Sequence, residues 1–127
     1  MARIREIVID CARPAALARF WAEALEGYGV RAYDDAEIAR LAGLGLTPET
    51  DPTVMVDGPG PILCFQQSAR SGEGRLHLDI AGGPREAEVA RLVGLGAQVR
   101  EARDGYTVML DPEGNRFCVQ DPRAEGG

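Results

Sequence analysis

Hydrophobic and polar positions change their spacing along the chain in an order that predicts strands and helices in turn. In Arg3–Cys11 apolar residues alternate with polar ones and place Ile7 and Ile9 on one face of a strand. A helical spacing of apolar residues follows in Pro14–Gly27 and returns in Pro84–Gly96. Proline at the start and glycine at the end are typical of helix boundaries. The pattern therefore predicts a strand and then a helix in each half of the chain.

One phrase of the sequence occurs twice. Thr53–Gln66 reads TVMVDGPGPILCFQ and Thr107–Gln120 reads TVMLDPEGNRFCVQ, which are identical at seven of fourteen positions without a gap. Each copy has two β-rich runs around Gly, Pro, Asp or Asn, and this pattern indicates a hairpin. The small-residue segment Ser68–Gly74 between the copies predicts the seam between the two halves.

A second repeat competes with the first. Ala36–Gly45 matches Ala87–Gly96 at eight of ten positions. After Gly96 there is room for a strand, Ala97–Arg103, before the hairpin, whereas the segment after Gly45 contains two prolines that do not suit a sheet interior. We therefore pair the helix from Pro14 with the helix from Pro84, and interpret residues 35–45 as an additional helix.

These elements predict an α+β fold with two tandem βαβββ modules, each of which curls a mixed sheet into a cup. Module one spans about residues 3–67 and includes the inserted helix, and module two spans about residues 75–121. A chain of 127 residues suits a single domain, which we expect over residues 1–127.

The charge balance bears on partners. Twenty acidic residues against fourteen basic ones give a net charge of −6, which argues against nucleic acid and favours neutral or cationic ligands. No apolar run is long enough to cross a bilayer, and the first residues do not resemble a signal peptide, so we expect a cytoplasmic protein without membrane contact. Cys11, Cys64 and Cys118 are odd in number and lie in strand-like runs, which favours reduced thiols.

The duplicated βαβββ unit with DPEGN before its last strand resembles the vicinal oxygen chelate superfamily. This superfamily includes glyoxalase I, extradiol dioxygenases and bleomycin-resistance proteins. The phrases DCARPAALARFWAEAL, AEIARLAGLGL, ILCFQ, RLHLDI and VMLDPEGNRFCV are most similar to the glyoxalase-like domain proteins common in actinobacteria. The resemblance implies a homodimer, with cups formed within one chain or across two.

The same resemblance implies a metal site made by the first and last strands of both modules. The matching positions are Glu6, Cys64, His77 and Cys118. Metal-dependent relatives usually carry His, Gln or Glu at the first-strand positions and Glu at the last-strand positions, so two carboxylates are replaced here by thiols. The four side chains suit a tetrahedral zinc ion, a divalent metal that accepts sulfur, nitrogen and oxygen. Alternatively, both cysteines pack the cup floor as small apolar groups and no cofactor is needed.

Two side chains are candidates for catalysis. His77 titrates near neutral pH and can transfer a proton or bind a ligand oxygen, and Glu6 can act as a general base in a cup with apolar walls. A purely structural pairing of Glu6 with an arginine or of His77 with a neighbour is the alternative. Other residues that share a strand face with these positions, or suit an adaptable apolar wall, are candidates for ligand binding: Asp79, Gln66, Arg116, Gln120, Met55 and Met109.

Two functions remain open. One is a glyoxalase-like enzyme that binds a small oxygenated metabolite in its cup and performs lyase-type or isomerase-type acid–base chemistry. The other is a binding protein of the bleomycin-resistance type that sequesters a drug or metabolite without chemistry. The identity of the small molecule is not readable from the sequence.

Overall fold

The computed structural model describes residues 4–69 and 78–122. The chain divides into two units between Ser71 and Gly72, which lies within the segment predicted as the seam. Each unit has a four-stranded mixed sheet, in the orders β1-β4-β3-β2 and β5-β8-β7-β6. In each sheet the first strand runs parallel to the last, and the other neighbours are antiparallel. The predicted α+β fold with two tandem βαβββ modules is confirmed.

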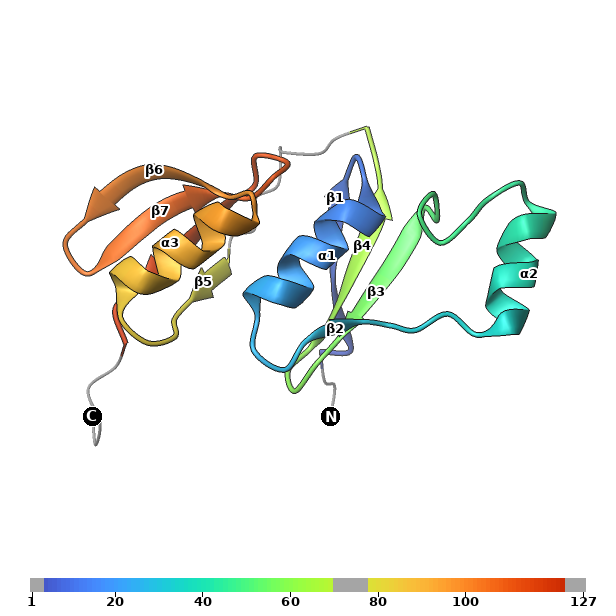
Figure 1. Cartoon of the computed structure of the whole chain (residues 1–127), viewed down its shortest axis with the longest axis horizontal. Coiled ribbons are helices and arrows are strands. Elements are labelled where there is room, and N and C mark those ends of the chain that lie inside the picture. Colours follow the sequence, from blue (N-terminus) through green and yellow to red (C-terminus); the bar gives the residue numbers. More distant parts are fainter. Residues whose placement is uncertain (1–3, 70–77, 123–127) are drawn as a thin grey trace. The chain divides into compact units, whose positions relative to one another are not determined.

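The first unit contains four strands and two helices (Figure 1). In chain order they are β1 (Glu6–Cys11), α1 (Pro14–Ala24), β2 (Gly29–Val30), α2 (Asp35–Gly43), β3 (Thr53–Asp57) and β4 (Ile62–Gln67). Strand β2 is only two residues long. The inserted helix is confirmed as α2.

Helix α1 covers one face of the first sheet. Val54 and Val56 on β3, with Leu63 and Phe65 on β4, are buried on the face to which α1 packs. Trp21 on α1 is 2% exposed and meets the edge of Phe20, so both are core residues as their helical spacing predicts. Burial of side chains of this size stabilises the fold by about 1.5–3 kcal/mol each.

Helix α2 stands apart from the sheet between two irregular segments (Figure 1). It begins at Asp34, whose carboxylate accepts a hydrogen bond of 2.8 Å from the backbone N–H of Glu37. This cap satisfies one of the free N–H groups of the first turn. Leu41 is the only α2 residue that is buried, so the helix depends on its flanking segments for its position.

The second unit repeats the arrangement without an inserted helix. Its elements are β5 (Leu78–Ile80), α3 (Arg85–Leu95), β6 (Gln98–Arg103), β7 (Tyr106–Leu110) and β8 (Arg116–Gln120). Helix α3 ends at Gly96, whose φ of 116° is left-handed and favours glycine. Asp111 stabilises the turn between β7 and β8, because its carboxylate accepts hydrogen bonds from the backbone N–H groups of Glu113 and Asn115, each 2.9 Å long.

The two hairpins differ by one residue in register, although their sequences align without a gap. Met55 pairs with Cys64 in the first hairpin, whereas Met109 pairs with Phe117 in the second. A slip of one residue turns every side chain of a strand to the other face. Met109 therefore lies on the buried face of its sheet, at 0% exposure, so Met55 and Met109 are not structurally equivalent although their sequences align.

None of the described helices is long and apolar enough to span a membrane.

Candidate functional site

The face of the first sheet opposite α1 carries three of the polar side chains predicted for a site, Glu6, Cys64 and Gln66. We call it the open face. Its members alternate along the strands with the residues that pack under α1, and pairing between strands brings them into rows. The open face consists of Glu6, Val8, Asp10, Thr53, Met55, Ile62, Cys64 and Gln66.

One row crosses the sheet through its centre. Val8 pairs with Cys64, and Cys64 pairs with Met55. The backbone N–H of Arg31 donates a hydrogen bond of 2.9 Å to the carbonyl oxygen of Met55, which brings Arg31 to the end of the row. Because neighbouring strands are about 4.8 Å apart, a ligand of modest size can touch several of these side chains at once.

Two charged side chains, Glu6 and Arg31, lie within electrostatic reach of the Cys64 thiol. Arg31 donates to both carboxylate oxygens of Asp57, at 2.9 Å from Nε and 2.7 Å from Nη2. These bonds raise the pKa of Arg31, and the charge of Glu6 adds to the effect, so Glu6 lies within electrostatic reach of the guanidinium. Burial raises the pKa of the Cys64 thiol, the charge of Glu6 raises it further, and Arg31 opposes both. The thiol is thus held in its protonated form at neutral pH.

A pocket of about 470 Å³ lies where the open face meets the α2 segment. We call it the α2 pocket. Its volume is within the range of small-molecule sites. Residues of β3, of α2 and of the segments on both sides of α2 line it: Arg31, Ala32, Tyr33, Asp34, Glu37, Arg40, Leu41, Leu44, Leu46, Asp51, Pro52, Thr53 and Met55.

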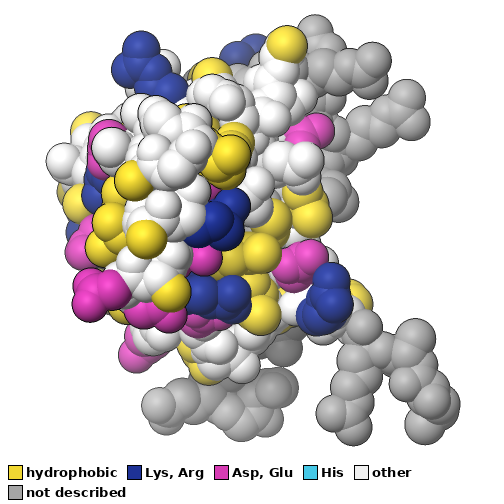
Figure 2. All heavy atoms as spheres, turned by 90° about the vertical axis from the view of Figure 1, so that its right-hand side faces the viewer, with side chains coloured by type: hydrophobic (Ala, Val, Ile, Leu, Met, Phe, Trp, Pro, Cys, Tyr) yellow, Lys and Arg dark blue, Asp and Glu magenta, His cyan; other side chains and the backbone are white. Residues whose placement is uncertain are grey.

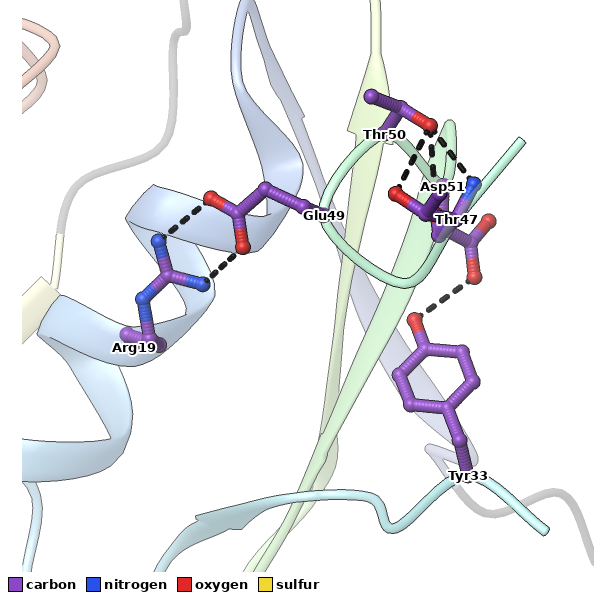
Figure 3. Close-up of polar contacts among 6 residues, drawn as sticks. All are labelled: Arg19, Tyr33, Thr47, Glu49, Thr50 and Asp51. Carbon is purple, nitrogen blue, oxygen red and sulfur yellow. Dashed lines mark hydrogen bonds and ion pairs between the residues drawn. The ribbon is translucent and has the colours of Figure 1, made fainter. Parts of the chain in front are cut away.

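Tyr33 and Asp51 connect the two segments that flank α2 (Figure 3). The Tyr33 hydroxyl donates a hydrogen bond of 2.8 Å to Oδ2 of Asp51, and the backbone N–H of Thr53 donates one of 3.0 Å to Oδ1. Asp51 is only 5% exposed. Burial raises the pKa of Tyr33, and the hydrogen bond and charge of Asp51 raise it further. The neutral phenol and the carboxylate are therefore a stable pair.

A second connection fixes the segment after α2 on α1. Arg19 on α1 donates two hydrogen bonds of 2.8 Å to the carboxylate of Glu49 (Figure 3). Close to it, the side-chain oxygen of Thr50 accepts a hydrogen bond of 2.9 Å from the backbone N–H of Thr47 and closes a tight turn. The segment after α2, which forms one wall of the α2 pocket, is therefore held by Arg19 of α1 on one side and by the Tyr33 hydroxyl on the other.

Figure 2 shows the side of the molecule that α2 occupies, where hydrophobic side chains lie exposed among basic and acidic ones. Leu44 and Ile38 of the α2 segment are 64% and 43% exposed, and Val8 on the open face is 44% exposed. Apolar surface next to charged groups at a concave site is typical of small-molecule recognition.

In the second unit, the residues on the face opposite α3 are those predicted from the alternation of side chains along each strand. Asp79 pairs with Cys118, and Arg116 and Gln120 alternate with the buried Phe117 and Val119 along β8. Burial raises the pKa of the Cys118 thiol, Asp79 raises it further, and Arg116 lowers it, so these three side chains are close. Met109 points to the α3 side and is not part of this face.

The described residues of either unit do not provide a metal site. No group of three or more His, Cys, Asp or Glu side chains within residues 4–69 and 78–122 is placed to hold an ion. Both thiols have raised pKa values, although a metal needs the thiolate. His77 lies outside the described residues, so the four-residue set stays a prediction. The chemistry proposed below uses no metal ion.

Several residues of the α2 pocket were not predicted as site residues, among them Arg31, Tyr33 and Asp51. The spacing of Asp34 and Glu37 before an apolar run does indicate a helix start. No local pattern connects Tyr33 with Asp51, because they meet only after the chain has passed through α2.

Comparisons with known proteins agree with this architecture. The sequence model of the Glyoxalase-like domain matches residues 6–120. None of the curated proteins matches this chain in sequence.

Solved structures show the same fold at low sequence identity. A glyoxalase/bleomycin resistance protein/dioxygenase family enzyme from Burkholderia phytofirmans PsJN is 17% identical, with a TM-score of 0.66, over 94% of this chain and 98% of the other. A possible glyoxalase from Bacillus cereus is 13% identical, with a TM-score of 0.64, over 94% and 99%. The trypanothione-dependent glyoxalase I of Leishmania major is 20% identical, with a TM-score of 0.59, over 95% and 87%.

Proposed function

The chain belongs to the Glyoxalase-like domain family, and on that premise we propose that it binds a small oxygenated organic molecule on the open face of its first unit. The observation that carries the proposal is the α2 pocket, of about 470 Å³, which contains Met55 of the open face. The pocket and the Val8–Cys64–Met55 row form one continuous surface for such a ligand.

Arg31 supplies a donor for a ligand oxygen. Its Nε and Nη2 are used by Asp57, whereas Nη1 donates no hydrogen bond to the part of the chain that the structure describes. A guanidinium that is already oriented by a carboxylate loses little freedom when it binds a further acceptor. Arg31 can therefore hold a carbonyl or hydroxyl oxygen over the open face.

Glu6 is the group on this face that can transfer a proton. Its side chain is 24% exposed and lies 3.5 Å from Arg5, a contact at the surface that leaves the carboxylate accessible. With a ligand oxygen on Arg31, Glu6 would take a proton from the adjacent carbon and return it at a neighbouring position. Arg31 would stabilise the negative charge that develops on the oxygen. The proton removed from one carbon is returned at the neighbouring position, so the reaction is an isomerisation with no net gain or loss of protons. His77 stays a second candidate for the same role.

Binding without chemistry is the second candidate function. Every buried side-chain nitrogen or oxygen in the described residues already has a hydrogen-bond partner. A pocket whose buried polar groups are satisfied before binding is preorganised for capture, and it does not need a reacting substrate to complete it.

One experiment separates the two functions. The full chain is screened by thermal shift with hydroxyketones, catechols, sugars and amino alcohols, and each compound that binds is then incubated in D2O and followed by NMR. An enzyme exchanges a carbon-bound proton of its ligand, and Glu6→Gln keeps binding but loses exchange. A sequestering protein binds equally with and without Glu6→Gln and exchanges nothing. No stabilisation by any compound would contradict the proposal.

The homodimer implied by the family resemblance stays a prediction. Sedimentation equilibrium of the full chain tests it directly.

A further inference from the structure

The α2 pocket combines apolar walls with an unequal set of charges. Its apolar side chains come from three segments, so a ligand body meets hydrophobic surface on several sides: Ala32, Leu41, Leu44, Leu46, Pro52 and Met55. The burial of such surface supplies binding free energy but does not select for charge. Selection depends on the ionised groups.

Both arginines of the pocket are neutralised inside the protein. Arg31 is paired with Asp57 through two hydrogen bonds of 2.9 and 2.7 Å. Arg40 is paired with Glu37 through Nη2 and Oε1, 2.6 Å apart, one turn earlier on α2. An anionic ligand would have to compete with a carboxylate at each arginine.

Two carboxylates of the pocket meet no guanidinium at ion-pair distance within the described residues. Asp34 accepts from the backbone N–H of Glu37, and Asp51 accepts from the Tyr33 hydroxyl and the Thr53 backbone N–H. All three donors are neutral, so they stabilise the carboxylates and leave their charges in place. The positive end of α2 offsets part of the charge of Asp34. The charge of Arg40 also reaches Asp51, but Arg40 is already paired with Glu37, so the buried Asp51 carboxylate remains a source of negative potential in the pocket.

The phenol of Tyr33 lies within reach of the same carboxylates. After burial and the hydrogen bond to Asp51, the charges of Asp51 and Glu37 also raise its pKa, and no positive group opposes them. A phenol surrounded by negative potential keeps its proton. Its hydroxyl donates to Asp51, and the oxygen retains lone pairs that can accept from a ligand.

We propose that the α2 pocket selects an organic cation, an amine or guanidinium with an apolar body, whose charge lies toward Asp51 and Asp34 and whose body lies on Leu41, Leu44 and Met55. The inference rests on the proposed binding function and adds the class of ligand. An oxygen on the same ligand would use Arg31, so an oxygenated amine satisfies both requirements.

The test uses three probes with the same apolar body. They are 3-phenylpropylamine, 3-phenylpropan-1-ol and 3-phenylpropanoate, which are cationic, neutral and anionic at pH 7. Binding to the full chain is measured by backbone amide NMR, with the shifts of residues 31–55 as the readout. We expect the amine to bind at least about tenfold more tightly than the carboxylate, with an advantage that shrinks as salt is added.

Three variants locate the charge. Asp51→Asn keeps hydrogen-bonding groups for Tyr33 and Thr53 and removes the charge, and we expect it to weaken amine binding about tenfold. Asp34→Asn keeps a good helix cap and should weaken amine binding less. Asp35→Asn removes one exposed negative charge from α2 outside the pocket lining, and it should leave amine affinity within about twofold because an exposed charge acts weakly.

The outcomes separate the two claims. If the alcohol or the carboxylate shifts residues 31–55 at concentrations as low as the amine does, the pocket binds small molecules and the selection for cations is wrong. Equal amine affinity in Asp51→Asn, Asp34→Asn and the unmodified chain would contradict the selection in the same way. If none of the three probes shifts these residues, both the selection and the binding function fail.

Discussion

Met55 lies directly across from Cys64 in the hairpin of β3 and β4. The counterpart of Met55 in the repeat, Met109, lies across from Phe117 and is fully buried. Residues 57–62 connect the two strands after the last residue pair of the first hairpin, Val56 and Leu63. Residues 111–115 do so after Leu110 and Arg116 in the second hairpin, so the second connection is one residue shorter. The shorter turn, fixed by the Asp111 carboxylate, converts one sequence repeat into two different strand faces.

Alanine substitution distinguishes the two methionines. Met109→Ala leaves a cavity in the core of the second unit, and we expect a loss of about 2–5 kcal/mol in the free energy of unfolding. Met55→Ala removes a partly exposed side chain and should cost less than about 2 kcal/mol. Urea unfolding of the two variants measures both values. Equal losses would show that the two hairpins share one register.

Tyr28 requires glycine in the first hairpin turn. A Cβ added at Gly58 would lie 2.4 Å from Cγ of Tyr28, and one at Gly60 would lie 2.6 Å from its hydroxyl oxygen. The hydroxyl donates a hydrogen bond of 3.0 Å to the carbonyl oxygen of Pro61. We expect Gly58→Ala to destabilise the chain by about 1–3 kcal/mol in urea unfolding, because the ring must move.

A double-mutant cycle provides the control for the turn. In a Tyr28→Ala background the obstacle is gone, so the cost of Gly58→Ala should fall to less than half. An unchanged cost in that background would show that the strain arises from the backbone of the turn and not from the Tyr28 ring.

Tyr33 makes the free energy of unfolding depend on pH in the alkaline range. Its pKa is raised in the folded chain, so above the ordinary tyrosine value of about 10 the unfolded chain loses this proton first and the folded chain loses stability. Tyr33→Phe removes the hydroxyl that donates to Asp51, and we expect it to lower the free energy of unfolding by about 1–2 kcal/mol at pH 8. The difference from the unmodified chain should be smaller at pH 10.5. Urea unfolding at both pH values measures this. A difference that stays constant or grows would contradict the pairing.

The thiols on the strands should react slowly. Burial raises the pKa of Cys64 and of Cys118, and the thiolate is the reactive form. We expect iodoacetamide at pH 8 to modify both more slowly than it modifies free cysteine, and to modify them readily in urea. Peptide mass spectrometry against time follows each residue separately. Modification of native Cys64 at the rate of free cysteine would contradict the raised pKa of its thiol.

The sequence predicted elements well where periodicity and turn residues agree. The helix from Pro14, the helix before Gly96 and the inserted α2 were each indicated by apolar spacing with an end signal, and the structure confirms all three. The faces of Glu6, Cys64 and Cys118 also follow from alternation alone. Such local rules hold because they depend on neighbouring residues along one element.

Register and the α2 pocket depend on contacts between distant residues. An ungapped repeat does not reveal that one turn is tighter, so the repeat alone does not show that Met55 and Met109 lie on different faces of their sheets. The α2 pocket requires Tyr33 to meet Asp51 and Arg31 to meet Asp57, pairs that are separated by 18 and 26 residues. The prolines around residue 50 indicated only that no strand forms there.

Methionine methyl NMR tests the central claim, that a small molecule binds in the α2 pocket on the open face of the first unit. The chain has three methionines, so three methyl resonances of the full chain can be assigned with Met55→Ala and Met109→Ala. On titration with 3-phenylpropylamine, we expect the Met55 methyl resonance to shift and saturate while that of the buried Met109 stays in place. A saturating shift of Met109, or binding of the probe that leaves Met55 unchanged, would contradict it.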